Sequence, residues 1–357
     1  FERGVTRDEL SSLLDILTRE REVEPLPEEL EKEVRSAGIK NIILKSIPKD
    51  KKSFLEVYND AVKAVKGAMN EVRTGKIPKT SEVKSVVTHL TDMVLSDTNA
   101  MIGLAMIKNY DEYLYNHSVN VSIFAISLGR FMNLDEKNLH VLGMAGLLHD
   151  IGKTGVAEDI IRKPGNLSSE EWEKIKQHPV LGSEITSRME GMDGKVPTVI
   201  YEHHIRYDYS GYPKEKRRLD PLSLIISVAD AYDALTTLRV YQKPTPPVEA
   251  MRMLRDLAGK HFDPKTVTAF QDMIGFYPVG TMVRLSTNEV GVVTGVSPGT
   301  GDQPVVKILY NNEGRPLDEP FNVDLSQKNP TPRIIVGTVD PLSKNMDLGE
   351  LFAKEAG

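Results

Sequence analysis

The chain has 357 residues, of which 40% are hydrophobic and 27% are charged, a composition typical of globular proteins. Its formal net charge of −6 lacks the basic excess that binding to a nucleic-acid polymer requires. Cysteine is absent, which excludes disulfides and thiolate metal sites, so any transition metal must be bound by His, Asp or Glu. No stretch is apolar for long enough to span a bilayer and the first residues lack a signal-peptide core, so we expect a cytoplasmic protein.

Three regions are predicted along the chain. Residues 1–104 are charged and follow a helical pattern, which predicts a regulatory or dimerisation region, and a homodimer formed through these helices is one expectation. Residues 105–277 show one helical pattern after another. Residues 278–357 contain short β-branched runs separated by Gly, Asn and Pro. The expected fold is mainly α, with an all-helical central domain and a small β-rich C-terminal appendage.

His117 lies on the inner face of a helix at the start of the central region. In "EYLYNHSVNVSIFAISL", the residues Tyr113, His117, Val121 and Phe124 share one helix face, which points the imidazole into a core. A lone histidine in such a place is more often structural than a ligand. The same placement recurs further along the chain, and this recurrence favours a ligand role.

The next inward histidine is followed directly by an aspartate. In "NLDEKNLHVLGMAGLLHDIGK", the residues Leu142, Gly146 and His149 follow the helical spacing of the core-facing side, and Gly152 is expected to end the helix. Asp150 is then carried inward beside His149. A buried carboxylate costs several kcal/mol unless it is paired or bound to a metal.

His178 follows a predicted helix start. In "SSEEWEKIKQHPVLGSEI", Ser168 and Glu171 have the spacing of a capping box, and Ile175 lies one turn before His178 on the inner face. Pro179 has no N–H to donate, so a backbone carbonyl near His178 is left free. We expect His178 to point inward from this helix.

Two adjacent histidines form the next candidate. In "YEHHIRYDYSGYP", the side chains of His203 and His204 must diverge, so they could serve different metal ions, or a metal and a ligand. Exposed loop histidines are the alternative for this pair.

The stretch "DPLSLIISVADAYDALT" carries a further carboxylate into the core. Asp220 and Pro221 are predicted to open a helix as its N-cap and first-turn residue. The helix is apolar almost all round, so Asp230 is expected to be buried and to need a cation. Asp233, three residues further on, is expected to hydrogen-bond a ligand or a helix end.

Together these residues outnumber what one metal ion needs, and a binuclear centre would use them well. The proposed ligands are His117, His149, Asp150, His178, His203, His204 and Asp230. Nitrogen and oxygen ligands without sulfur suit two divalent ions such as iron or manganese better than a structural zinc. Two ions about 3.5–4 Å apart can hold both free oxygens of a phosphodiester. The pattern therefore predicts hydrolysis of a phosphoester.

The order and spacing of "HDIGK", "HPVLGSEI", "HHIRYDYSGYP" and "VADAYDALTTLRVY" resembles the HD-GYP phosphodiesterases, a branch of the HD metal-dependent phosphohydrolases. The resemblance covers residues 105–277. It implies an all-helical domain that hydrolyses cyclic di-GMP to the linear dinucleotide pGpG, and sometimes onward to GMP, by attack of a hydroxide that bridges the metals.

Residue by residue, the resemblance implies two ligand sets that share Asp150. One set is His117, His149, Asp150 and Asp230, and the other is Asp150, His178, His203 and His204. Lys153 resembles the lysine that contacts the scissile phosphate. The other implied substrate contacts are Tyr212, Asp233, Arg239 and Lys243. The Gly211-Tyr212-Pro213 turn resembles a loop that borders the substrate and has been linked to the binding of signalling partners.

This sequence departs from the family pattern at several positions. Tyr113 stands where three-metal members have a glutamate, so two ions are expected. Ile205 replaces an acid, and Tyr209 replaces a glycine, so we expect the loop to follow another path because φ > 0 strains a tyrosine. Gln242 stands where a basic residue is usual, with Lys243 after it.

Two further readings stay open. Altered residues at Ile205, Tyr209 and Gln242 would fit a sensor or docking module that binds the nucleotide without cleaving it. The substrate could also be cyclic GMP-AMP, because the residues that select a purine cannot be placed from the sequence. Asp111 is one candidate for the acid that protonates the departing oxygen.

Overall fold

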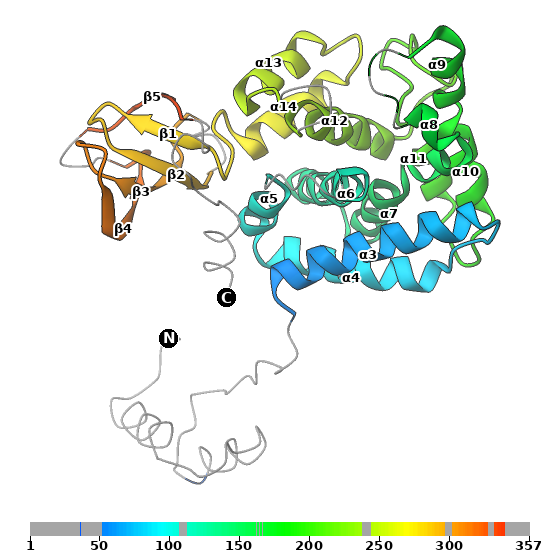
Figure 1. Cartoon of the computed structure of the whole chain (residues 1–357), viewed down its shortest axis with the longest axis horizontal. Helices are drawn as coiled ribbons and strands as arrows, with labels where there is room; N and C mark the ends of the chain where they lie inside the picture. The colour runs from blue at the N-terminus through cyan, green and yellow to red at the C-terminus, as the bar shows by residue number, and fades with distance from the viewer. Residues whose placement is uncertain are drawn as a thin grey trace. The chain divides into compact units, whose positions relative to one another are not determined.

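The computed structural model describes residue 36 and residues 52–106, 113–161, 163, 165, 167–237, 244–296, 302–327 and 332–339. Within these ranges the chain is helical up to Ile274 and forms strands after it, as the sequence predicted (Figure 1). The helices expected over residues 1–51 lie outside the described residues, apart from residue 36. No described helix has both the length and the apolarity needed to cross a membrane.

Contacts divide the chain after Lys52, and Ser53–Gly357 forms one unit. Its first helices are α3 (Phe54–Arg73), α4 (Thr80–Ser96) and α5 (Thr98–Met106). Ser53 and Glu56 form a capping box that starts α3. Helices α3 to α5 share one hydrophobic core with the helices that follow. The boundary expected at residue 104 therefore does not separate two cores.

Three helices that pack against one another position His117, His149 and Asp230. They are α6 (Tyr113–Phe131), α7 (Glu136–Leu148) and α12 (Pro221–Thr236). Helices α6 and α7 approach closely at Gly146, where a Cβ atom would lie 2.6 Å from the Cα of Ser122. Asp220 caps α12 as predicted, because its side chain accepts a hydrogen bond from the backbone N–H of Leu222.

The remaining helical segments follow α7 and α12 along the chain. They are the 3-10 helix η1 (Ile151–Gly155), α8 (Glu158–Ile161), α9 (Ser169–Ile175), α10 (His178–Ser187), α11 (Lys195–Glu202), α13 (Pro247–Asp256) and α14 (Pro264–Ile274). The predicted capping box at Ser168 and Glu171 is present at the start of α9. The helix expected to run through His178 is instead two helices, α9 and α10.

The C-terminal region is an antiparallel sheet in the order β4-β3-β2-β1-β5. Its strands are β1 (Met282–Leu285), β2 (Val290–Gly295), β3 (Val305–Tyr310), β4 (Pro316–Asp324) and β5 (Ile335–Thr338). Because side chains alternate along a strand, each face buries its own set. Val283 and Val293 belong to a cluster within the sheet, whereas Met282 and Val292 belong to the helical core.

Candidate metal centre

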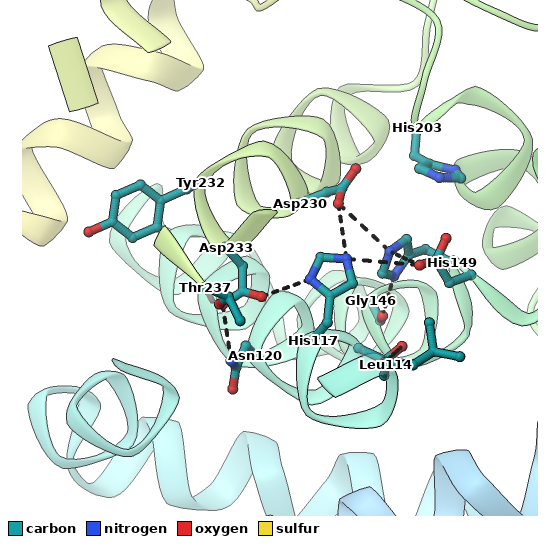
Figure 2. Close-up of polar contacts among 12 residues, drawn as sticks. Leu114, His117, Asn120, Gly146, His149, His203, Asp230, Tyr232, Asp233 and Thr237 are labelled. Atoms are coloured by element: carbon teal, nitrogen blue, oxygen red, sulfur yellow. Dashed lines mark hydrogen bonds and ion pairs between the residues drawn. The ribbon is translucent and has the colours of Figure 1, made fainter. Parts of the chain in front are cut away.

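Seven side chains from five separate segments converge at one place. His117 lies on α6, His149 and Asp150 follow α7, His178 begins α10, His203 and His204 follow α11, and Asp230 lies on α12. Three groups could each hold an ion: His117 with His149 and Asp150, His149 with His203 and Asp230, and His178 with His203 and His204. Within each group the ligand atoms lie within 4.8 Å of one another. Figure 2 shows His117, His149 and Asp230 pointing toward one another.

The carboxylate of Asp150 lies between His149 and His117 on one side and His178 on the other. Its Oδ2 atom is 3.4 Å from His149 Nε2 and 3.9 Å from His117 Nε2. Its Oδ1 atom is 3.4 Å from His178 Nε2. Burial alone would raise the pKa of Asp150, but nearby His149 and Lys153 hold it well below the usual range. The ionised carboxylate thus presents one oxygen to His149 and His117 and the other to His178.

Backbone carbonyls orient three of the imidazoles. The Nδ1 atoms of His149, His178 and His203 lie 2.8, 2.7 and 2.6 Å from the carbonyl oxygens of the residue three positions earlier, Gly146, Ile175 and Ile200. A carbonyl can only accept, so each Nδ1 carries a proton and donates. The Nε2 atoms of His149 and His178 each lie 3.4 Å from an oxygen of Asp150, and those of His178 and His203 lie 3.2 Å apart. These carbonyls belong to the last turns of α7, α9 and α11, where helices leave acceptors without intrahelical partners.

The site contains buried polar atoms that a metal ion would satisfy. Among the described residues, His149 Nε2 and Asp150 Oδ1 are buried and have no hydrogen-bond partner. Each such atom costs about 1–3 kcal/mol when it stays unpaired. An unpaired imidazole lone pair beside an unpaired carboxylate oxygen matches the donors that divalent transition metals bind. The residues present therefore fit the predicted ions.

Burial keeps three of the histidines neutral in the metal-free protein. It lowers the pKa of His178 to about 3 and that of His203 to about 4, and it also lowers the pKa of His204. Neutral imidazoles are the form that binds a metal, so these residues need no deprotonation at neutral pH.

His117 differs because two carboxylates contact it. Its Nε2 atom is 3.2 Å from Asp230 Oδ1, and its Nδ1 atom is 2.7 Å from Asp233 Oδ2. Burial alone would lower the pKa of His117, but these carboxylates outweigh it and raise the pKa to about 9. Metal binding at this residue would therefore release a proton.

We expect the metal-free protein to be most stable near neutral pH. Between about pH 6.5 and about pH 4 the unfolded chain binds protons on His178, His203 and His204 that the folded chain does not. The free energy of unfolding therefore decreases as the pH is lowered through this range. The stabilisation from His117 is fully present below about pH 6.5 and is lost as the pH rises through about 9. Urea unfolding of chelator-treated protein at a series of pH values checks both limbs. A free energy of unfolding that keeps rising toward acid pH would contradict the prediction.

Asp233 was expected to contact the substrate, and its position corrects that expectation. The residue is fully buried. Its carboxylate accepts hydrogen bonds from His117 Nδ1 at 2.7 Å, from Asn120 Nδ2 at 3.0 Å and from Thr237 Oγ1 at 3.0 Å (Figure 2). Asp233 therefore orients a proposed ligand from behind and cannot reach a substrate. Asn120 was missed, although its place three residues after His117 puts both on one face of α6.

The outer side of the site combines a cation with aromatic rings. Lys153 Nζ donates to Asp150 Oδ2 at 2.6 Å, and the lysine side chain is 25% exposed. The ring centroid of Tyr212 lies 4.8 Å from that of His204 and 6.2 Å from that of Trp172. Trp172 is 45% exposed and is the only tryptophan of the chain. These rings form a row from the histidines to the surface, which the sequence pattern did not reveal.

The loop before Tyr212 keeps the backbone path that a glycine would favour. Tyr209 has a φ of 62°, which corrects the expectation that the loop takes another path. A left-handed φ of this kind costs a non-glycine residue about 1–3 kcal/mol. Gly211 is needed for close packing, because a Cβ atom there would lie 2.1 Å from the carbonyl oxygen of His204. The N–H of Tyr212 donates to that same carbonyl at 3.0 Å.

Two local expectations near the histidines have clear outcomes. Helix α7 ends at Leu148, so Gly152 does not end it and lies instead in η1. A Cβ atom at Gly152 would lie 2.0 Å from the carbonyl oxygen of His178, so glycine permits close contact with α10. The carbonyl left free by Pro179 is confirmed to be that of Ile175, which accepts from His178 Nδ1.

Several sequence-based expectations fall outside the described residues. These are the substrate contacts Arg239 and Lys243, the altered position Gln242 and the candidate acid Asp111. The side chain of Tyr113 is also not described. The structure places none of these side chains relative to the seven converging residues.

Family models match the two parts of the chain described above. The model of the HD domain matches residues 103–266, and a model of a KOW domain associated with the HD domain matches residues 282–342. The chain belongs to the HD domain family. Its motifs and its curated relatives place it in the HD-GYP branch of that family.

Curated relatives match the chain over different lengths. A cyclic di-GMP phosphodiesterase of Pseudomonas aeruginosa is 34% identical over 275 residues, which cover 76% of this chain and 66% of the relative. A cyclic di-GMP phosphodiesterase of Thermotoga maritima is 38% identical over 171 residues, which cover 47% of this chain and 46% of the relative. For a 3'3'-cGAMP-specific phosphodiesterase of Vibrio cholerae the identity is 33%, and 42% of this chain covers 30% of the relative. The chain thus spans less than the full length of each.

A solved structure shares the fold. It is an HDG"Y"P protein of Bdellovibrio bacteriovorus, with a TM-score of 0.51 and 21% sequence identity. The match covers 70% of this chain and 81% of that chain.

Proposed function

We propose that this protein is a metal-dependent cyclic-dinucleotide phosphodiesterase that hydrolyses cyclic di-GMP to the linear dinucleotide pGpG. The observation that carries the proposal is the carboxylate of Asp150, which presents one oxygen to His149 and His117 and the other to His178. That placement supports two ions with Asp150 as their shared ligand. The names of the curated relatives support the substrate class.

In the proposed reaction, water attacks one phosphorus, the bond to the ribose 3′ oxygen breaks, and that oxygen takes a proton. Bound divalent ions would supply Lewis-acid stabilisation of the phosphate oxygens and would lower the pKa of water. His117, His149, Asp150 and Asp230 would bind one ion, and Asp150, His178, His203 and His204 the other. Lys153 places a positive charge beside Asp150, where it can offset negative charge on the phosphate oxygens.

The proposal includes the identity of the metal. Imidazole and carboxylate donors without sulfur support iron or manganese, and the tyrosine at position 113 supports two ions rather than three. Elemental analysis of protein purified without oxygen tests this point. A content of three ions per chain would refute the argument from position 113.

The direct test is incubation of the full chain with cyclic di-GMP and reduced iron or manganese, with products separated by chromatography. Metal-dependent appearance of pGpG is expected, and later GMP would show that hydrolysis proceeds further. A parallel reaction with 3′3′-cyclic GMP-AMP tests the alternative substrate, which the Vibrio relative supports. Tight binding of either nucleotide by metal-loaded protein without any product would favour the sensor alternative. Homodimerisation, a partner at the Gly211-Tyr212-Pro213 turn and the cytoplasmic location stay predictions.

We expect Trp172 to stack on a purine of the bound nucleotide. Its exposed ring ends the aromatic row that starts at His204, and stacking of a base on an aromatic ring contributes about 1–3 kcal/mol. Trp172→Ala should therefore raise KM about tenfold, whereas Trp172→Phe should largely restore it. Because the chain has a single tryptophan, nucleotide binding should also quench the intrinsic fluorescence of the wild-type protein.

The matched control is Phe276→Ala, which removes another exposed ring, 39% exposed, that is not in this row. Its KM should stay at the wild-type value. An equal change of KM in both variants, or no change of fluorescence at saturating nucleotide, would rule out stacking on Trp172.

A further inference from the structure

A line of hydrogen bonds, part-buried at Tyr58 and buried from Asn120 onward, connects α3 with the proposed metal ligand His117. The hydroxyl of Tyr58 on α3 donates to Asn120 Oδ1 at 2.8 Å. Asn120 Nδ2 donates to Asp233 Oδ1 at 3.0 Å, and His117 Nδ1 donates to Asp233 Oδ2 at 2.7 Å. Figure 2 shows Asn120 and Asp233 on the side of His117 that faces away from Asp230 and His149.

The direction of each bond in this line is determined by chemistry. The carboxylate of Asp233 only accepts, so Asn120 must turn its amide nitrogen toward it and its carbonyl oxygen toward Tyr58. Burial raises the pKa of Tyr58, with a further contribution from the charge of Asp233, so the hydroxyl keeps its proton and stays a donor. Removing that hydroxyl would leave the oxygen of Asn120, which is 2% exposed, without this donor.

Helix α3 is firmly placed at this point of the fold. Val57 and Ala61, on either side of Tyr58, are buried, and α3 packs against α6, which carries both His117 and Asn120. The line therefore joins three helices, since Tyr58 lies on α3, Asn120 and His117 on α6, and Asp233 on α12, and α6 packs against both of the others. A ligand held in this way loses little freedom when it binds an ion, which favours binding.

We propose that Tyr58 is a positioning residue, which acts through Asn120 and Asp233 to hold the imidazole of His117 in the orientation that binds a divalent ion. The inference rests on the proposed function, since it assumes that His117 is a metal ligand. It adds to that function a residue from outside the motif region.

The test measures metal binding directly, by titrating chelator-treated full-length protein with Co²⁺ and recording the visible absorption of the bound ion. Tyr58→Phe should raise the apparent Kd for Co²⁺ by about tenfold and change the absorption spectrum, because orienting partners of ligands typically contribute 10–100-fold. The matched control is Tyr115→Phe on α6, whose ring is contacted by Lys66 of α3. That variant also loses one tyrosine hydroxyl at a residue of α6 whose ring faces α3, and its Kd should stay within about twofold of wild type.

A second variant separates positioning from a general loss of stability. Asn120→Ala removes the acceptor of Tyr58, so adding Tyr58→Phe to it should cause no further loss of affinity if the effect passes through Asn120. Wild-type affinity and spectrum in Tyr58→Phe would overturn the proposal, as would equal losses in Tyr58→Phe and Tyr115→Phe. Failure of the wild-type chain to bind Co²⁺ would instead refute the proposed metal centre, and this inference with it.

Discussion

Replacing Asp150 with asparagine is expected to abolish turnover and to reduce the metal content of the protein. The amide keeps the size of the side chain but removes the charge and turns an N–H₂ group toward either His178 or His149. The amide nitrogen only donates hydrogen bonds and cannot bind a metal ion, so only one oxygen is left for two ions. Lewis-acid stabilisation by bound ions contributes several kcal/mol to lowering a barrier, and a loss of about 4 kcal/mol corresponds to about a thousandfold in rate.

Asp135→Asn provides the matched control for this change. Asp135 caps the other end of α7, where its side chain accepts from the N–H of Asn138 at 2.8 Å. Asparagine caps helices about as well, so both metal content and rate should stay at their wild-type values. Elemental analysis and product chromatography measure the two quantities. A full complement of ions in Asp150→Asn would disprove the shared-ligand arrangement.

Gly152→Ala is expected to disable the site without replacing any proposed ligand. The added Cβ atom would lie 2.0 Å from the carbonyl oxygen of His178 and 2.5 Å from the amide nitrogen of Gly182. Both atoms belong to the backbone of α10, so either η1 or α10 must shift. A displacement of about 1 Å at a reactive centre lowers rates by about a hundredfold. The strain should also reduce the free energy of unfolding by about 1–3 kcal/mol.

Gly194→Ala is the control for the glycine substitution. A Cβ atom there would meet nothing within 4 Å, and its φ of −61° suits alanine. Thermal unfolding together with cyclic di-GMP hydrolysis measures both variants. A Gly152→Ala protein that keeps wild-type activity would show that η1 can move without disturbing His178.

Much of the site was predictable because helical spacing reports which side chains point inward. His117, His149 and His178 were placed on inner faces, and each is at most 3% exposed, although His149 follows the end of α7 and His178 begins a separate helix, α10. Asp230 was expected to be buried because α12 is apolar almost all round, and it is 9% exposed. Spacing within a helix therefore indicated which polar side chains would be buried. The number of these side chains led to the prediction of two metal ions.

Features that depend on contacts between distant segments were not predictable. The role of Gly152 depends on the backbone of α10, and the hydrogen bonds that Asp233 accepts come from Asn120 and His117 of α6. The carbonyls that orient the imidazoles depend on where each helix ends, and the sequence placed the end of α7 too late. The sequence around Tyr58 contains no motif, so nothing in it distinguishes this residue from other tyrosines that pack against the core.

The position of Tyr58 also bears on how much of the chain is needed to form the complete site. The HD domain match begins at residue 103, whereas the last donor to Asn120 comes from α3. A fragment trimmed to the match would keep the five imidazoles of the proposed metal centre and lose both that donor and the apolar cover that α3 and α4 give to α6 and α7. If Tyr58 has the proposed role, substitutions in α3, which carries no motif residue, are expected to change the affinity for metal while every motif stays intact.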